Sequence, residues 1–187
     1  MKQLGVKERI VAAASHLFYF DGYNQTGINK ILKEANVSKD SMYRYFRSKE
    51  DIAVAYLRGR HVMWMGNLMD YVKPKKTNKE KVTASFDYLS AWLKEVDYRG
   101  CGWQNIITDL PHDHDKIRDQ AVLHKNEVRE WIHSLMVDDA QYSTKVAKEL
   151  GDEIIVLIEG AIILSQIQKN DWPIKTAKRT CVRLLSN

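Results

Sequence analysis

Residues 26–50 read TGINKILKEANVSKDSMYRYFRSKE, and this stretch decides the fold. Its first apolar residues recur at helical spacing and predict a short helix with Thr26 as its N-cap. They are Ile28, Ile31, Leu32 and Ala35. Ser38 is a suitable N-cap for a second helix over residues 39–46, and Asn36, in the turn between them, tolerates a left-handed backbone conformation. Two short helices joined by a tight turn predict a helix-turn-helix over about residues 27–46.

The helical pattern continues on both sides of this motif. Residues 7–20 predict an amphipathic helix that ends at Asp21-Gly22. Ser48 and Asp51 have the spacing of a capping pattern, which starts a fourth helix that we expect to run to about residue 72. Five further helices are expected over residues 79–97, 101–110, 114–137, 143–169 and 174–185. The sequence therefore predicts an all-α fold of about nine helices, with one domain over residues 1–50 and a larger one over residues 51–187.

The composition agrees with long helices, because only three prolines and nine glycines occur in 187 residues. The two cysteines are far apart in the sequence, which predicts neither a disulfide nor a zinc site and indicates a cytoplasmic protein. The N-terminus has no apolar segment of the signal-peptide type. The most apolar stretch, residues 154–167, is short and contains Glu159, so we expect no membrane span.

The positive charge is concentrated at one end of the chain. Residues 1–60 contain eleven Lys or Arg and six Asp or Glu, whereas the remainder contains eighteen of each. The whole net charge of +5 therefore comes from the segment that holds the helix-turn-helix. A local positive excess attracts the phosphate backbone of nucleic acids.

The segment 26–50 closely resembles the signature of the TetR/AcrR family of transcriptional regulators. That signature is T-x-x-x-x-I, a turn with Val, and then S-K-x-[ST]-[LM]-Y-x-[HY]-F-x-[SN]-K-E. The residues that fit it are Thr26, Ile31, Val37, Ser38, Lys39, Ser41, Met42, Tyr43, Tyr45, Phe46, Ser48, Lys49 and Glu50. The resemblance covers about residues 7–60. Further along, the chain is similar to the family in its helical plan, and residues 99–110, RGCGWQNIITDL, resemble an R-G-C-x-x-x-N segment of one subgroup.

The resemblance implies a DNA-binding domain over residues 1–50 and an effector-binding and dimerisation domain over residues 51–187. A regulator of this family binds a palindromic operator as a dimer and is released by a small molecule, and repression is commoner than activation. No cofactor and no catalytic residue is expected. The alternative is that the exposed basic and aromatic side chains form only the solvated face of a helical bundle.

The second helix of the motif is expected to enter the major groove of operator DNA. Lys39, Asp40 and Arg44 are the candidate base contacts, and Arg44 is best suited to a guanine. The resemblance implies phosphate contacts at Thr26, Ser41, Tyr43, Tyr45 and Lys49. Gly27 is included among the expected DNA contacts, although Thr or Ser is frequent at its position. Asp40 stands where Gly is common, so the operator sequence does not carry over from relatives.

The helix expected over residues 143–169 is apolar on nearly every side, which a monomer of this size rarely accommodates. We therefore expect a homodimer formed through about residues 143–185. The alternative is a central core helix in a monomer.

Aromatic residues on the helices between residues 51 and 137 predict a pocket for an apolar or aromatic effector. The candidate ligand-binding residues are Trp64, Phe86, Trp92, Trp103, Asn105, His124 and Trp131. Taken singly, each of them can equally be an ordinary core residue.

Three other functions stay open. Cys101 with His112 and His114 suggests a thiol–imidazole pair or a metal site, and hence a helical enzyme or metal-binding protein, although their spacing is not typical of either. Cys101 can alternatively be a redox sensor of a regulator. The protein can also be a DNA-binding activator that takes no ligand.

Overall fold

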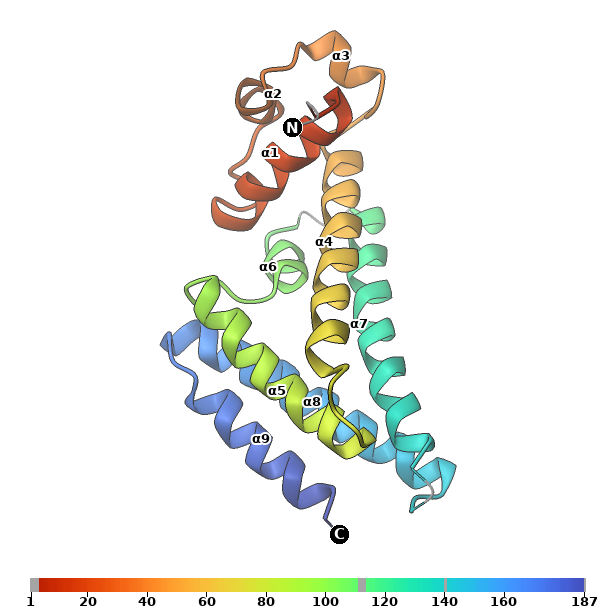
Figure 1. The fold of residues 1–187 in the computed structure, drawn as a ribbon. Helices are drawn as coiled ribbons and strands as arrows, with labels where there is room; N and C mark the ends of the chain where they lie inside the picture. Colours follow the sequence, from red (N-terminus) through yellow and green to blue (C-terminus); the bar gives the residue numbers. More distant parts are fainter. Residues whose placement is uncertain (1–3, 111–113, 140, 187) are drawn as a thin grey trace. The chain divides into compact units, whose positions relative to one another are not determined.

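A computed structural model describes residues 4–110, 114–139 and 141–186, and these residues form nine helices and no strand (Figure 1). The helices are α1 (Val6–Phe20), α2 (Ile28–Ala35), α3 (Lys39–Tyr43), α4 (Lys49–Val72), α5 (Asn78–Glu95), α6 (Gly102–Thr108), α7 (Asp115–Val137), α8 (Thr144–Gln168) and α9 (Trp172–Leu184). The predicted all-α fold is confirmed. No helix among the described residues is both long enough and apolar enough to cross a membrane.

The chain forms two compact units. Unit 1 comprises residues 1–63 and 102–123, and unit 2 comprises residues 64–101 and 124–187. The long helices α4 and α7 each begin in unit 1 and end in unit 2. Unit 1 therefore contains more than the predicted domain over residues 1–50, because the first half of α4, α6 and the first part of α7 belong to it.

Unit 1 holds α1, α2 and α3 around a small apolar core. Its buried side chains include Ile10, Ala14, Leu17, Phe18, Ile31, Met42, Phe46 and Ile52. Asn36 adopts the expected left-handed conformation with a φ of 50°. Arg9 reaches the end of α2, where its Nη1 donates hydrogen bonds to the carbonyls of Ala35 at 3.2 Å and Asn36 at 3.0 Å. Carbonyls at the end of a helix otherwise lack partners, so Arg9 fixes the turn of the motif.

Two local predictions in this unit are wrong. Thr26 does not cap α2, because Gly27 is the N-cap residue. The Thr26 side chain is fully buried instead, and its hydroxyl donates a hydrogen bond of 2.7 Å to the carbonyl of Gly22. The helix expected over residues 39–46 ends at Tyr43, so Tyr45 and Phe46 follow it in a turn. Phe46 is buried in the core, and its N–H still donates a hydrogen bond of 2.9 Å to the carbonyl of Met42.

The connection between α1 and α2 is tied to α6 within unit 1. The backbone N–H of Asn24 donates a hydrogen bond of 2.7 Å to Oδ2 of Asp109, just beyond the end of α6.

The start of α4 is held by two contacts of Asp51. Lys116 at the start of α7 pairs with Asp51 at 2.9 Å. The capping pattern at the start of α4 is confirmed, because Ser48 Oγ accepts a hydrogen bond of 3.1 Å from the N–H of Asp51.

Unit 2 is built from α5, α8 and α9 with the later parts of α4 and α7, and α9 packs on α5 and α8 (Figure 1). One side of α8 supplies Ile154, Ile158 and Ile162 to the core. The helix also exposes two large apolar side chains, because Val156 and Ile167 are each 72% exposed. Apolar residues all round α8 are therefore only partly used within one copy of the chain.

Asp171 links α9 to α5, and this contact predicts a pH-dependent stability. Its carboxylate lies 2.7 Å from Lys94 and 3.0 Å from Lys175, and the hydrogen bond from Lys94, followed by that from Lys175, lowers its pKa to about 2. An aspartate whose pKa is lowered by folding stabilises the protein above its unfolded pKa and loses this contribution as the pH falls towards 2.

We expect Asp171→Asn to lower the free energy of unfolding at pH 7 by about 1 kcal/mol, because both lysines are more than half exposed and their attraction is screened by water. The difference from the wild type should shrink as the pH falls from about 4 to about 2. Urea unfolding followed by circular dichroism measures it, with Asp97→Asn, an exposed aspartate paired with Lys169, as the control. A constant difference across this pH range would contradict the assigned ion pairs.

Candidate nucleic-acid interface

The side chains expected to contact DNA lie on and just after α3. Lys39, Asp40, Tyr43, Arg44 and Tyr45 are all exposed. Tyr43 and Tyr45 are 49% and 51% exposed, so both side chains are accessible to a partner. Lys39 Nζ lies 6.0 Å from the centre of the Tyr43 ring. The structure therefore presents donors and aromatic side chains to solvent along one short helix.

Arg44 is held by a chain of hydroxyl groups. Its Nη2 donates a hydrogen bond of 2.8 Å to Ser41 Oγ, and Ser38 Oγ donates one of 3.0 Å to the same oxygen. Ser38 Oγ also accepts from the N–H of Ser41 at 3.3 Å and thereby caps α3, as predicted. Sequence analysis missed this positioning role of Ser38. An arginine that is already oriented loses less side-chain freedom when it pairs with a base edge.

Two of the predicted phosphate contacts, Thr26 and Lys49, have hydrogen-bond partners within the chain. Thr26 is buried with its hydroxyl bonded to Gly22, so its side chain does not reach solvent. Lys49 donates a hydrogen bond of 3.0 Å to the carbonyl of Tyr23 and lies 4.0 Å over the Tyr23 ring. Partial burial lowers the pKa of Lys49. Both residues stabilise the connection between α1 and α2 in the chain without DNA, and their phosphate contacts stay predictions.

Gly27 is exposed at the N-terminus of α2, and a Cβ atom built on it would meet nothing within 4 Å. A bulkier residue would fit at this position, so the glycine is not needed for packing. Its exposure keeps it among the proposed contacts. Ser41 is half-buried, and its hydroxyl is engaged by Arg44 and Ser38.

The aromatic residues expected to bind an effector fall into both units. Trp64, Trp92 and His124 meet in unit 2, where the Trp64 ring centre lies 6.0 Å from that of Trp92 and 5.3 Å from that of His124. Tyr88, which sequence analysis missed, joins them at 5.5 Å. We call these four residues the Trp64 cluster. Helical spacing in the sequence could have revealed Tyr88, because it lies four residues before Trp92 and therefore on the same face of α5.

The other predicted ligand residues are placed as follows. Phe86 is fully buried and Trp131 is half-buried, both in unit 2. Trp103, buried, and Asn105, half-buried, belong to α6 in unit 1. Within the described residues, the indole Nε1 of Trp64 is buried and has no hydrogen-bond partner. A buried donor without an acceptor is uncommon in native proteins, so an acceptor on a bound molecule or a water would satisfy it.

Cys101 and His114, which suggested an enzyme, a metal site or a redox sensor, lie in different units. Cys101 is buried in unit 2, and Lys125 Nζ lies 3.5 Å from its Sγ. His114 stacks edge-on against Tyr23 in unit 1, and His112 lies outside the described residues. No three His, Cys, Asp or Glu residues in the described part of the chain are placed to hold a metal ion.

Comparison with known proteins shows to which family the chain belongs. The family model of bacterial regulatory proteins, tetR family, matches residues 10–56, and the C-terminal domain model of LmrA/YxaF-like transcriptional regulators matches residues 79–180. The HTH-type transcriptional regulator LmrA of Bacillus subtilis (strain 168) is 26% identical over 180 residues, which cover 90% of each chain. The HTH-type transcriptional repressor NemR of Escherichia coli (strain K12) is 28% identical over 97 residues, 51% of this chain and 49% of NemR.

Among solved structures, the fold is similar to that of SCO4454, a TetR-family transcriptional regulator from Streptomyces coelicolor. The TM-score is 0.86 at 19% identity, over 97% of this chain and 88% of that one. At this identity the likeness concerns the fold alone. The two family models, however, cover the helix-turn-helix and more than half of the chain beyond it. The chain thus belongs to the TetR family, and it is a DNA-binding regulator of transcription rather than an enzyme.

Proposed function

We propose that this regulator is a repressor that binds a palindromic operator as a homodimer and is released by a small apolar or aromatic effector. The observation that carries the proposal is the exposed α3 face, where Ser41 orients Arg44 towards solvent beside Lys39 and Tyr43. Arg44 would read a guanine, with Lys39 and Asp40 at neighbouring bases. Tyr43, Tyr45 and the backbone around Gly27 would contact phosphates. Because the target is chromosomal DNA, the proposed site of action is the cytoplasm.

One copy of α3 covers only half of an operator, so the proposal needs a second copy. The surface of α8 and α9 supports a dimer through about residues 143–185. Val156 and Leu157 line an apolar hollow of about 460 Å³ on this surface, together with Thr180 and Leu184 of α9. The same hollow is bordered by the acidic residues Asp152 and Glu153, whereas the exposed face of α9 carries Arg179 and Arg183. Apolar surface with charges of both signs suits contact with an identical copy.

The effector is proposed to bind at the Trp64 cluster in unit 2. Its aromatic rings provide apolar surface, and the unpartnered Nε1 of Trp64 would donate to an acceptor on the ligand. Trp103, Asn105, Phe86 and Trp131 remain proposed contacts. An effector that binds better to a conformation unable to place both copies of α3 on the operator lowers the affinity for DNA. DNA in turn lowers the affinity for the effector by the same factor.

A footprint of the full-length protein on genomic DNA tests this function. We expect a sharp protected region with two symmetric half-sites about one helical turn apart, located over a promoter. Binding that needs an upstream site and raises transcription would favour an activator instead. If the protein shows no preference for any double-stranded sequence at moderate ionic strength, the proposed function is wrong.

Regulation through Cys101 is the second candidate. A cation beside a thiol favours the reactive thiolate, and Lys125 Nζ lies 3.5 Å from Cys101 Sγ. Two features oppose it. Lys125 also pairs with Glu159 at 2.6 Å, and Cys101 is only 3% exposed.

We expect both cysteines of the native protein to react with a thiol reagent about 100-fold more slowly than in urea, because local opening must precede reaction. Cys181 serves as the internal control, since it is fully buried and burial raises its pKa to about 12. Reaction is followed by mass spectrometry of the labelled peptides. Rapid labelling of Cys101 alone, together with loss of operator binding, would favour redox control.

A further inference from the structure

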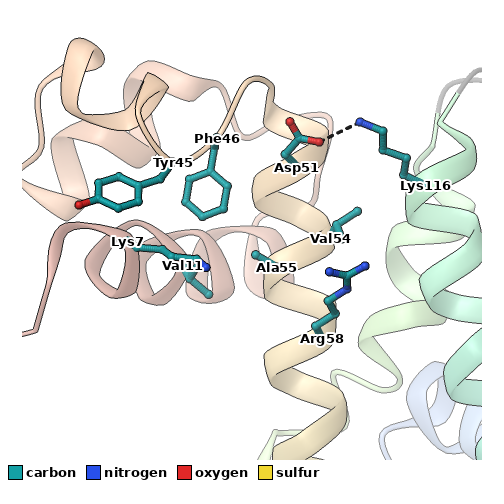
Figure 2. Close-up of a pocket in the computed structure, with 9 residues that line it drawn as sticks. All are labelled: Lys7, Val11, Tyr45, Phe46, Asp51, Val54, Ala55, Arg58 and Lys116. Atoms are coloured by element: carbon teal, nitrogen blue, oxygen red, sulfur yellow. Dashed lines mark hydrogen bonds and ion pairs between the residues drawn. The ribbon is translucent and has the colours of Figure 1, made fainter.

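A hollow in unit 1 has no role in the function described so far. Its volume is about 560 Å³, and it opens between α1, the turn after α3 and the first half of α4 (Figure 2). Its apolar lining residues, which we call the floor, are Val11, Phe46, Val54 and Ala55. Phe46 is only 4% exposed and belongs to the core, whereas Val11, Val54 and Ala55 are half-buried. The volume is within the range of pockets that hold small organic molecules.

The rim of the hollow is positively charged. Lys7, Arg58 and Lys116 line it, against a single carboxylate, Asp51. Asp51 is already neutralised by Lys116 at 2.9 Å and accepts a hydrogen bond of 3.2 Å from the N–H of Arg47, and these contacts lower its pKa. Figure 2 shows the ion pair between Asp51, at the start of α4, and Lys116, at the start of α7. Lys7 and Arg58 therefore leave an excess of positive charge over an apolar floor.

Arg58 is placed to hold an anion. Its Nε donates a hydrogen bond of 3.1 Å to Gln120 Oε1, which fixes the plane of the guanidinium group. The guanidinium lies beside Val54 and below the pair of Asp51 and Lys116 in Figure 2. Guanidinium groups bind carboxylates through two parallel hydrogen bonds, and the Nη groups of Arg58 remain to donate them.

We propose that this hollow binds a small monocarboxylate with an apolar body, such as an aryl acid or a short aliphatic acid. The carboxylate pairs with Arg58 and Lys7, and the apolar body covers Val11 and Ala55. A phosphate of the DNA backbone shares the negative charge but has no apolar part to place on this floor. The organic acid is therefore the occupant that uses both halves of the site.

The site would be coupled to DNA binding through Tyr45. This residue lines the hollow and is also one of the proposed phosphate contacts, two residues after the end of α3. A ligand beneath Tyr45 and beside Phe46 changes the position of the turn that supports α3. Because such coupling is reciprocal, operator DNA and the acid would alter each other's affinity by the same factor. This second site is separate from the Trp64 cluster, which belongs to unit 2.

Isothermal titration of the full-length, DNA-free protein with sodium benzoate and sodium hexanoate tests the proposal. We expect dissociation constants of about 1 mM, typical of ligands with so few atoms. Arg58→Gln should raise them at least about tenfold through the loss of charge-assisted hydrogen bonds. Arg118→Gln is the matched control, because Arg118 is equally an exposed arginine of unit 1 but does not line the hollow, and it should leave binding unchanged.

Two further arms locate the ligand and identify its class. Ala55→Phe fills the floor and should abolish binding of both acids, with folding checked by circular dichroism. Benzamide, which lacks the charge, and inorganic phosphate, which lacks the apolar body, should bind at least about tenfold more weakly than benzoate. The proposal is overturned if neither acid binds, if Arg58→Gln and Ala55→Phe bind them like the wild type, or if phosphate binds as well as benzoate. None of these results depends on an operator, so the repressor function is tested separately.

Discussion

Arg44→Ala is expected to remove specific operator binding while the protein stays folded and dimeric. A bidentate contact from arginine to guanine contributes about 1–3 kcal/mol of discrimination, and a dimer makes it twice. The expected loss of affinity is therefore roughly 30-fold to 10⁴-fold. The side chain is exposed and its hydrogen bond to Ser41 is local, so its removal leaves the core of unit 1 intact.

Titration of a labelled operator in a mobility-shift assay measures this loss, with a scrambled duplex to measure non-specific binding. Non-specific affinity should fall only slightly, because one phosphate-attracting charge is lost per copy. Arg44→Lys keeps the charge but loses the two parallel hydrogen bonds, so its affinity for the operator should also be lower than that of the wild type. Arg118→Ala, with the same charge change on α7, should bind normally. An Arg44→Ala protein that binds the operator within threefold of the wild type would contradict the assigned base contact.

The second large effect is expected from Val156→Glu on α8. Val156 is 72% exposed within one copy, so glutamate is tolerated by the fold of a single chain. In the proposed symmetric dimer, residue 156 of each copy is buried in the interface. An unpaired charge buried in an interface costs several kcal/mol. We expect the dimer dissociation constant to rise at least about 100-fold. Operator affinity should fall with it, because a single copy binds only one half-site.

Light scattering after gel filtration at micromolar concentration measures the change. Val62→Glu on α4 is a matched control, because Val62 is also 72% exposed and lies outside residues 143–185. The control should remain dimeric and bind the operator. Ile167→Glu, on the same helix as Val156 and with the same exposure, should behave like Val156→Glu. If Val156→Glu and Ile167→Glu both remain dimers of wild-type affinity, the interface lies elsewhere on the chain.

Local sequence signals accounted for most of the helices. The starts of α3 and α4 follow from Ser38 and Ser48, whose hydroxyl groups accept hydrogen bonds from N–H groups three residues ahead. The left-handed turn at Asn36 follows from the tolerance of asparagine for this conformation. These features depend on residues a few positions apart, so a single sequence contains the necessary information.

The burial and the hydrogen-bond partners of individual side chains depended on how segments of the chain pack together. Thr26 and Lys49 fit a family signature, but the signature alone does not tell which groups of the folded chain their side chains bond to. Thr26 bonds to the nearby Gly22, whereas Lys49 bonds to Tyr23, 26 residues away, because the start of α4 packs against the connection between α1 and α2. Phe46 lies beyond the end of α3, and it is nevertheless buried in the core of unit 1.

The amino-acid sequence by itself determined the family, the helices found in the described residues and the motif that presents Arg44, because helical periodicity and capping are local properties of the chain. Only the tertiary structure decided which side chains meet. It joined Trp64 of α4 to His124 of α7, and it placed Arg58 and Lys7 around one apolar hollow. Burial and charge pairing between distant segments arise when the chain packs, and no short-range pattern encodes them.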